Sequence, residues 1–227
     1  MKINIKDCRC YFLTNNNDKR KRHILNEFND HNITEVNSCL SENTKHQSFC
    51  TGWSRMVDLG SKNQNNSKPF QPFVCLEDDV KKYRDFPEEI EIPDDTDILY
   101  IGLSQHGCTN KLTNQIKFLS FSNINSNIIR IYNMLASHGI IICSTAGALA
   151  IQRSLLEGYF KNRDCDLFMA SLQPYYNVYA LRKPLVYQYG DIGGEEMATK
   201  FEIHQENNTI SPELIKNDTV GLKCCYL

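Results

Sequence analysis

The residues best suited to chemistry are three consecutive carboxylates, Glu77, Asp78 and Asp79, which follow the apolar run at 73–76 without a break. Three adjacent anions repel one another, and their position at the end of a buried strand costs stability unless a cation lies beside them. Mg²⁺ and Mn²⁺ prefer carboxylate oxygens and complete a small set of protein ligands with substrate phosphates. We therefore expect Asp79 to bind Mn²⁺ or Mg²⁺, with Asp78 or Glu77 completing the site. The alternative interpretation is a solvated acidic turn.

Two arginines, Arg20 and Arg22, fall in the first turn of a predicted helix. Cations there oppose the helix dipole, at a cost of ~0.3–1 kcal/mol each. A bound diphosphate would remove this conflict, because helix N-termini and arginine side chains both bind phosphate. We therefore expect Arg20 and Arg22 to contact a diphosphate. The alternative is a solvated basic turn.

The elements that must position these side chains alternate between strands and helices. Short apolar runs predict strands at 10–13, 73–76, 97–103, 128–135, 139–143 and 185–187. Capping residues and apolar residues at helical spacing predict helices from about 15–17 to 30, from 47 to 59 and from 145 to 157. The alternation predicts an α/β protein with a mixed, mostly parallel central sheet flanked by helices. Ligands of such sheets gather at the carboxyl ends of strands, where residues 77–79 would lie.

The composition narrows the classes of function. A chain of 227 residues can bury a stable core, and its net charge of -2 gives no overall attraction to nucleic acid. The N-terminus has no apolar signal-peptide core, and no run approaches the length of a membrane span. Ten cysteines without C-x-x-C spacing favour free thiols in a reducing compartment. We expect a cytoplasmic protein with no transmembrane segment and no nucleic-acid partner.

The run VCLEDDV at 74–80 resembles the strand-and-acidic-loop signature of family 25 glycosyltransferases. That family includes lipooligosaccharide and collagen galactosyltransferases, and related enzymes occur in large DNA viruses, including those that infect algae. Further segments resemble the family in the same order, at 11–14, 18–20, 49–59, 97–102, 139–150, 164–168, 178–180 and 184–188. The resemblance covers about residues 8–192. It departs at Ser54-Arg55, where the family has Ser-His.

The resemblance implies one GT-A-like, Rossmann-like domain over 1–227. It implies an enzyme that moves a sugar from a nucleotide-sugar donor, UDP-linked, to a hydroxyl group of a glycan acceptor, with inversion. The donor contacts that we expect come from Leu13, Thr14, Arg20, Arg22, Arg55, Glu77 and Asp78. GT-A enzymes often lend a C-terminal histidine to the metal, which makes His204 a candidate ligand. If the chain is viral, its compartment would be the host cytoplasm.

Inverting transfer needs a base that accepts the proton of the acceptor hydroxyl, from a segment other than 77–79. We expect Asp191 to be this base, because it lies in a glycine-bordered loop that a saccharide can approach closely. Asp166 is the second choice, with a helix-capping role as its structural alternative. The loop Ser104-Gln105-His106-Gly107 is a further acceptor-side candidate.

Two other functions compete with glycosyl transfer. A two-metal phosphoesterase or nuclease also gathers carboxylates at strand ends, but it needs more ligands in separate motifs, and a nuclease needs a basic surface. A binding module with a degenerate site would be expected to have lost the acidic triplet, which is intact here.

Overall fold

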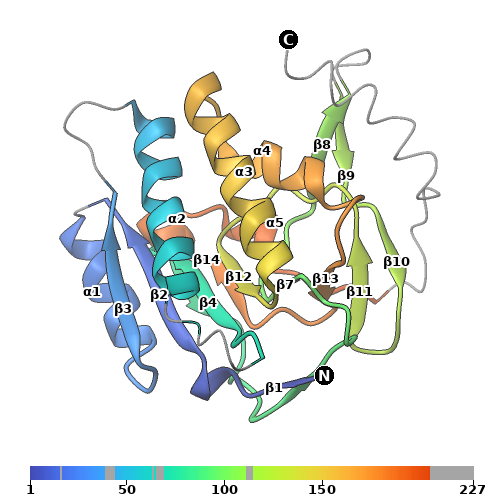
Figure 1. Ribbon diagram of the computed structural model, residues 1–227. Helices are drawn as coiled ribbons and strands as arrows, with labels where there is room; N and C mark the ends of the chain where they lie inside the picture. Colours follow the sequence, from blue (N-terminus) through green and yellow to red (C-terminus); the bar gives the residue numbers. More distant parts are fainter. Residues whose placement is uncertain (16, 39–43, 63, 65–68, 111–114, 205–227) are drawn as a thin grey trace.

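An eight-stranded sheet forms the centre of the computed structural model, which describes residues 1–15, 17–38, 44–62, 64, 69–110 and 115–204. Figure 1 shows this sheet with helices packed against it. Its strands lie in the order β10-β11-β13-β7-β12-β4-β2-β3. In chain order they are β2 (Arg9–Thr14), β3 (Ile33–Asn37), β4 (Phe73–Glu77), β7 (Ile98–Tyr100), β10 (Phe121–Asn123), β11 (Ile128–Ile131), β12 (Gly139–Ile142) and β13 (Val178–Leu181).

The sheet is mixed, as the sequence predicts. β2 pairs in parallel with both β3 and β4, and β7 pairs in parallel with β13. β12 lies between β4 and β7 and runs antiparallel to both, and β11 runs antiparallel to β13 and β10. Three of the seven neighbour pairings are therefore parallel and four antiparallel, although six of the eight strands point the same way. The expectation of mostly parallel pairing is wrong, because β11 and β12 each run antiparallel to both of their neighbours.

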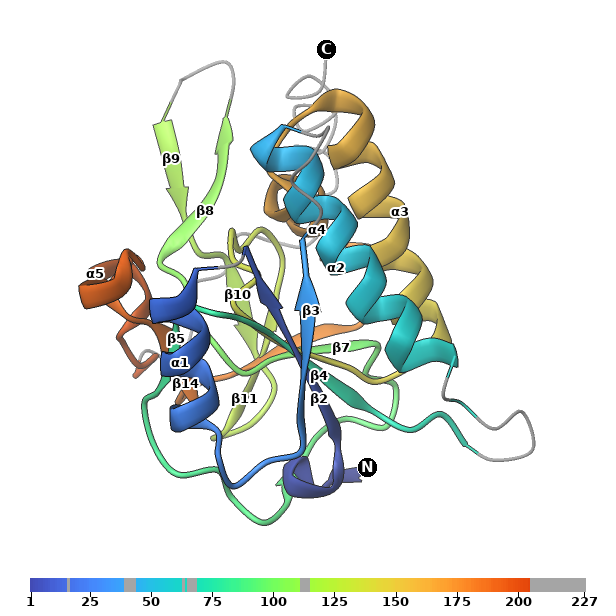
Figure 2. The same ribbon diagram turned by 90° about the vertical axis from the view of Figure 1, so that its left-hand side faces the viewer.

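Helices cover both faces of the sheet. In the view of Figure 2, the sheet separates one layer of helices, α2 (Lys45–Lys62), α3 (Thr145–Lys161) and α4 (Cys165–Leu172), from helix α1 (Asp18–Glu27). The expected helices at 47–59 and 145–157 thus exist and extend further. This arrangement of an α/β sheet flanked by helices agrees with a Rossmann-like organisation.

Alternation along the strands builds a separate core on each face. Leu13 and Cys75 point to the α2–α3 side, where they pack in one cluster with Trp53 of α2. Phe12 and Leu76, their chain neighbours, belong to the second cluster, which includes residues of α1. Because both faces are covered, the strands read as continuous apolar runs in the sequence.

Three two-stranded sheets and short helical turns complete the described fold. The pair that matters for the site is β5 (Val80–Lys82) with β14 (Val186–Gln188), in which Gln188 lies opposite Val80. The remaining elements are β1 (Lys2–Ile3), β6 (Ile90–Glu91), β8 (His106–Asn110), β9 (Gln115–Phe118), α5 (Glu196–Thr199) and the 3-10 turns η1 (Ile5–Asp7) and η2 (Gly190–Ile192).

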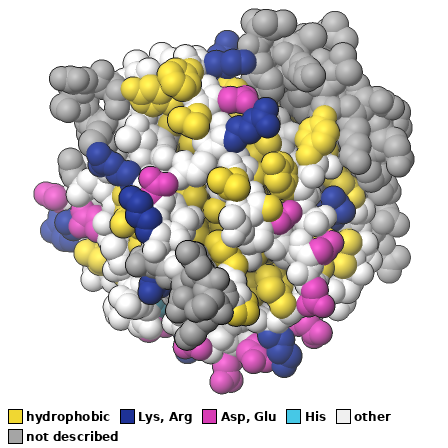
Figure 3. All heavy atoms as spheres, in the orientation of Figure 1, with side chains coloured by type: hydrophobic (Ala, Val, Ile, Leu, Met, Phe, Trp, Pro, Cys, Tyr) yellow, Lys and Arg dark blue, Asp and Glu magenta, His cyan; other side chains and the backbone are white. Residues whose placement is uncertain are grey.

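The outer face of the helical layer mixes apolar and charged groups, as Figure 3 shows in the orientation of Figure 1. Leu149, Leu156 and Phe160 of α3 are exposed on its surface. None of the helices in the described part of the chain is long and apolar enough to cross a membrane. The described cysteines are free thiols, as predicted from their spacing.

Candidate functional site

The three predicted carboxylates lie where the central sheet passes into the β5–β14 pair. Glu77 is the last residue of β4, and Asp78 and Asp79 form the corner before β5 begins at Val80. The side chains of Asp78 and Asp79 are each only 6% exposed. A surface turn would leave its carboxylates in water, so the interpretation as a solvated acidic turn is wrong.

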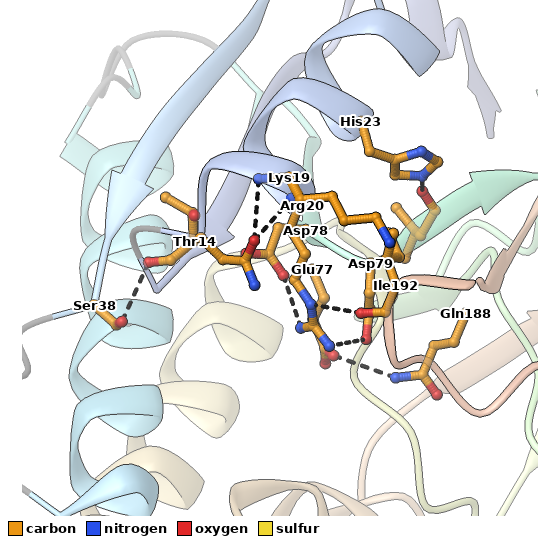
Figure 4. Close-up of polar contacts among 12 residues, drawn as sticks. Thr14, Lys19, Arg20, His23, Ser38, Glu77, Asp78, Asp79, Gln188 and Ile192 are labelled. Carbon is orange, nitrogen blue, oxygen red and sulfur yellow. Dashed lines mark hydrogen bonds and ion pairs between the residues drawn. The ribbon is translucent and has the colours of Figure 1, made fainter. Parts of the chain in front are cut away.

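Arg20 is the cation that lies closest to these carboxylates in the described structure. Its Nη1 donates to Oδ1 of Asp78 over 3.1 Å, and its Nη2 lies 3.6 Å from Oδ2 of Asp79. Asn17 starts helix α1 by accepting from the backbone N–H groups of Lys19 and Arg20, which fixes Arg20 in the first turn. Figure 4 shows the guanidinium group extending from α1 to the two aspartates.

The segment after β14 packs over this ion pair. The backbone N–H of Tyr189 donates to the carbonyl of Asp79 over 2.7 Å. Nε of Arg20 donates to the carbonyl of Ile192 over 3.0 Å, and Nζ of Lys19 donates to the carbonyl of Asp191 over 2.9 Å. Gly193 has a φ of 92°, and a Cβ there would lie 3.1 Å from Nη2 of Arg20. Helix α1, the acidic corner and the 189–194 segment therefore form one connected unit.

The balance of charge in this unit is negative. Burial raises the pKa of Asp79 to about 6, and the nearby charge of Arg20 only partly offsets that cost. Burial also raises the pKa of Asp78, again against the opposing effect of Arg20. Among the described residues, none donates a hydrogen bond to the buried Oδ2 of Asp78 or to the buried Oδ1 of Asp79. One arginine is thus too little positive charge for the two carboxylates.

A hard divalent cation would offset the cost of burying these two unpartnered oxygens. Among the described residues, no three His, Cys, Asp or Glu side chains converge as a ready-made metal site. Asp78 and Asp79 would therefore supply a partial ligand set, to be completed by ligand phosphates and water, as is common for Mg²⁺.

Glu77 lines a pocket of about 350 Å³ that Asp78, Asp79 and Arg20 do not line. Its Oε1 accepts from the hydroxyl of Ser137 over 2.5 Å, and its Oε2 accepts from Nε2 of Gln188 over 3.4 Å. Burial raises the pKa of Glu77 to about 8, and the charge of Asp79 adds to this shift. Glu77 is therefore the member of the triplet that holds a proton most readily near neutral pH.

Asp166 lines the same pocket as Glu77. It lies in the first turn of α4, and burial raises its pKa to about 6 while the charge of Asp164 raises it further. The negative charge of Asp166 also raises the pKa of Glu77, because the two carboxylates repel each other. Of these two carboxyl groups, Glu77 is thus largely protonated at pH 7 and Asp166 is largely ionised.

Asp191, the preferred base in the sequence-based prediction, does not line this pocket. Its carboxylate is exposed and accepts a hydrogen bond from the hydroxyl of Tyr189. It sits in turn η2, where the carbonyls of Asp191 and Ile192 accept hydrogen bonds from Lys19 and Arg20. Of the two predicted base candidates, Asp166 is therefore the one that shares a pocket with Glu77.

The other predicted arginines are not brought to the carboxylates. Nε of Arg22 donates to the carbonyl of Asp18 in its own helix. Nη1 of Arg55 donates to the carbonyl of Asn37 at the end of β3, on the exposed surface. Helical geometry explains the first result, because Arg20 and Arg22 are two residues apart and project in different directions.

Leu13 and Thr14 end β2 next to the acidic corner, as expected for residues beside a ligand. The Leu13 side chain is fully used in the core, where a Cβ on Gly52 would lie 2.2 Å from its Cδ1, so only the backbone of Leu13 is available to a ligand. Thr14 is buried, and its carbonyl accepts from the hydroxyl of Ser38 over 3.2 Å.

His204 is not placed at the metal site. Its side chain is 78% exposed, and its Nε2 lies 3.8 Å from Oε2 of Glu202. Glu202 itself forms an ion pair with Arg84. The N–H of Ile203 donates to the carbonyl of Arg182, which fixes this segment beside β13. The prediction that His204 reaches Asp79 is therefore not supported by the described chain.

Several polar residues of the pocket were not assigned to the site from the sequence, among them Ser137, His46 and Glu195. Ser137 reaches Glu77 because β12, which it precedes, pairs with β4. No local motif marks these residues. Ser104, by contrast, was an acceptor-side candidate, and it does line the pocket.

No protein-family model matches the chain, and no curated protein matches it in sequence. The site is therefore interpreted from its own geometry and charge.

Proposed function

We propose that the protein is a metal-dependent glycosyltransferase, which moves a sugar from a nucleotide-sugar donor to a hydroxyl group of a glycan acceptor. One observation carries the proposal: two buried aspartates with unused oxygens face an arginine in the first turn of a helix, at the carboxyl end of a sheet strand. A nucleoside diphosphate suits this arrangement, because its charge can be shared by a divalent cation and a guanidinium group.

The donor side of the proposal comprises Asp78, Asp79 and Arg20. Asp78 and Asp79 would hold Mn²⁺ or Mg²⁺, which when bound would stabilise the negative charge of the departing nucleoside diphosphate. Arg20 would exchange part of its contact with the aspartates for contact with the phosphates, since it already lies within reach of both carboxylates. Thr14 and the backbone of Leu13 would line the nucleotide end.

The acceptor side of the proposal comprises Asp166 and Glu77. A base with a pKa of about 6 is largely ionised at pH 7 and can accept the proton of an acceptor hydroxyl. Glu77 would position the acceptor together with Gln188, with which it already shares a hydrogen bond. The two carboxyl groups belong to different elements from the donor-side cation Arg20, so acceptor and donor would approach from different directions.

Thermal stability in the presence of ligands tests the donor part. UDP together with Mn²⁺ should raise the melting temperature by more than the sum of the shifts with UDP alone and Mn²⁺ alone. Variant Asp79→Asn should abolish that synergy, whereas Asp85→Asn, on the exposed β5–β6 connection, should retain it. Additive shifts in the unmodified protein would contradict the proposal. A panel of nucleotide sugars, assayed for UDP release, would then identify the donor.

Assays on the same protein preparation distinguish a glycosyltransferase from a phosphoesterase that uses the same carboxylates. It would hydrolyse p-nitrophenyl phosphate in Mn²⁺ without any acceptor, whereas a glycosyltransferase would release UDP only from a nucleotide sugar. Release of inorganic phosphate as the main product would favour the phosphoesterase.

A further inference from the structure

The pocket beside Glu77 is of a size that suits a small acceptor group. Its volume of about 350 Å³ lies at the low end of the ~300–1,000 Å³ range of ligand pockets. Ser104, Ser137 and Gln188 supply hydrogen-bonding side chains to its lining, and Phe49 supplies an aromatic side chain. Polar groups beside one aromatic ring are suited to a sugar, which has hydroxyl groups at its edge and apolar C–H groups on its face.

The charges around this pocket are unequal. Four carboxyl groups line it, from Glu77, Asp164, Asp166 and Glu195, against two basic side chains. One of the two, His46, already contacts Asp164, with 2.7 Å between its Nδ1 and Oδ1 of the aspartate. The other, Lys45, is exposed. Glu77 and Asp166 are the more buried of the four carboxyl groups, and Asp166 is the one of these two that is ionised near neutral pH, so the interior of the pocket carries a negative charge with two further carboxylates at its rim.

The neighbouring donor site would not reverse this balance. Asp78 and Asp79 add two further carboxylates next to Glu77, and Arg20 is the single cation that contacts them in the described structure. A divalent cation bound there would arrive with a nucleoside diphosphate, whose negative charge offsets that of the cation. An acceptor group entering beside Glu77 would therefore meet a negative potential whether or not the donor is bound.

We propose that this pocket selects acceptors by charge: it takes a hydroxyl compound without negative charge, a neutral or amino-bearing sugar, and rejects phosphorylated or carboxylated sugars. The inference rests on the proposed function, because it names the acceptor class of the same reaction. An anion would be repelled by Asp166 in the interior and by Asp164 and Glu195 at the rim. A neutral sugar could use Ser104, Ser137 and Gln188, and an ammonium group would in addition be attracted by Asp166.

Size-matched probes test this selectivity without any need for turnover. Glucose, glucosamine, glucose 6-phosphate and glucuronate would be titrated into the protein with UDP and Mg²⁺, and binding followed by saturation-transfer NMR. We expect the two uncharged or cationic probes to bind at least roughly tenfold tighter than the two anionic probes, as like-charge repulsion requires. Equal or tighter binding of an anionic probe, or no binding of any probe, would overturn the proposal.

Charge reversal at the exposed rim provides the matched comparison. The double variant Asp164→Lys and Glu195→Lys should gain at least about fivefold in affinity for glucose 6-phosphate and glucuronate. The control Asp85→Lys and Glu88→Lys makes the same net change at exposed positions that do not line the pocket. An equal gain in the control would mean that overall charge decides binding, and would overturn the proposal. Synergy between UDP and Mn²⁺ reports the donor site alone, so failure of this inference is distinguishable from failure of the proposed function.

Discussion

Arg20 donates a hydrogen bond from Nη1 to Oδ1 of Asp78 over 3.1 Å, which ties the first turn of α1 to the end of β4. The two residues are 58 positions apart in the sequence. Their contact places the N-terminus of a helix, where anions are favoured, against carboxylates that need a cation. The ion pair is therefore the point at which the protein could exchange an internal counter-charge for a bound metal and diphosphate.

Replacing Arg20 should separate its structural role from its ligand-binding role. Without ligands, Arg20→Ala should be roughly 1–3 kcal/mol less stable, because two buried carboxylates lose their counter-charge. Saturating Mn²⁺ should restore much of that loss, and UDP affinity in Mn²⁺ should fall by about tenfold or more. Chemical denaturation and calorimetric titration measure the two effects.

The matched control for this variant is Arg22→Ala. Arg22 lies in the same helix and hydrogen-bonds only to the carbonyl of Asp18 among the contacts described, so stability and UDP affinity should change little. Equal losses in the two variants would mean that the charge of the helix, rather than the contact with the aspartates, is responsible.

Replacing Asp79 should act in opposite directions on stability and on ligand binding. Its pKa is raised to about 6, mainly by burial, so the ionised form is disfavoured by folding at pH 7. Asp79→Asn removes that charge, and the melting temperature without metal should stay the same or rise. The UDP affinity gained from Mn²⁺ should disappear. Unchanged UDP affinity in Mn²⁺ would show that Asp79 is not a metal ligand.

Stability without metal should fall as the pH rises from about 4.5 to 8. The folded-state pKa values of Glu77, Asp79 and Asp166 are raised to about 8, 6 and 6. The folded protein therefore binds more protons than the unfolded chain over this window, and the stabilising effect of those protons is lost as each folded-state pKa is passed. Glu77→Gln should flatten the slope between pH 6 and 8, as measured by urea denaturation at each pH. A slope that is unchanged in this variant would assign the effect to other groups.

The proposed donor side of the site was largely predictable from the sequence, because each of its residues is marked by a local pattern. The apolar run 73–76 ends directly in the carboxylates, and Arg20 follows a helix-capping asparagine. The acidic corner then has to lie at a strand end, and the arginine at a helix start. What the sequence does not show is the choice between Arg20 and Arg22, which depends on the exact start of α1.

The proposed acceptor side was less predictable, because its residues come together through strand order. β12 lies between β4 and β7, although it follows both in the chain, and this insertion brings Ser137 to Glu77. The pairing of β14 with β5 brings Gln188 to the same carboxylate. Neither contact has a signature in local spacing. The glycine-bordered position of Asp191 likewise did not reveal that its loop contacts Lys19 and Arg20, and its role as base stays a prediction.

Asp166 should be the residue on which proton transfer depends. General-base catalysis contributes ~10²–10⁴-fold, so Asp166→Asn should lower turnover by about that factor. Donor affinity in Mn²⁺ should be nearly unchanged, because Asp166 lines the pocket on the Glu77 side and does not contact Arg20, Asp78 or Asp79 through any described hydrogen bond. Turnover at saturating donor and Mn²⁺ should rise with pH through about 6, where Asp166 loses its proton, since bound metal keeps the aspartates ionised. Asp191→Asn is the control and should keep more than half of the rate. The assignment fails if Asp166→Asn retains that much activity, or if it loses the rate while its pH profile stays that of the unmodified protein. A loss confined to Asp191→Asn would instead return the role of base to the loop after β14.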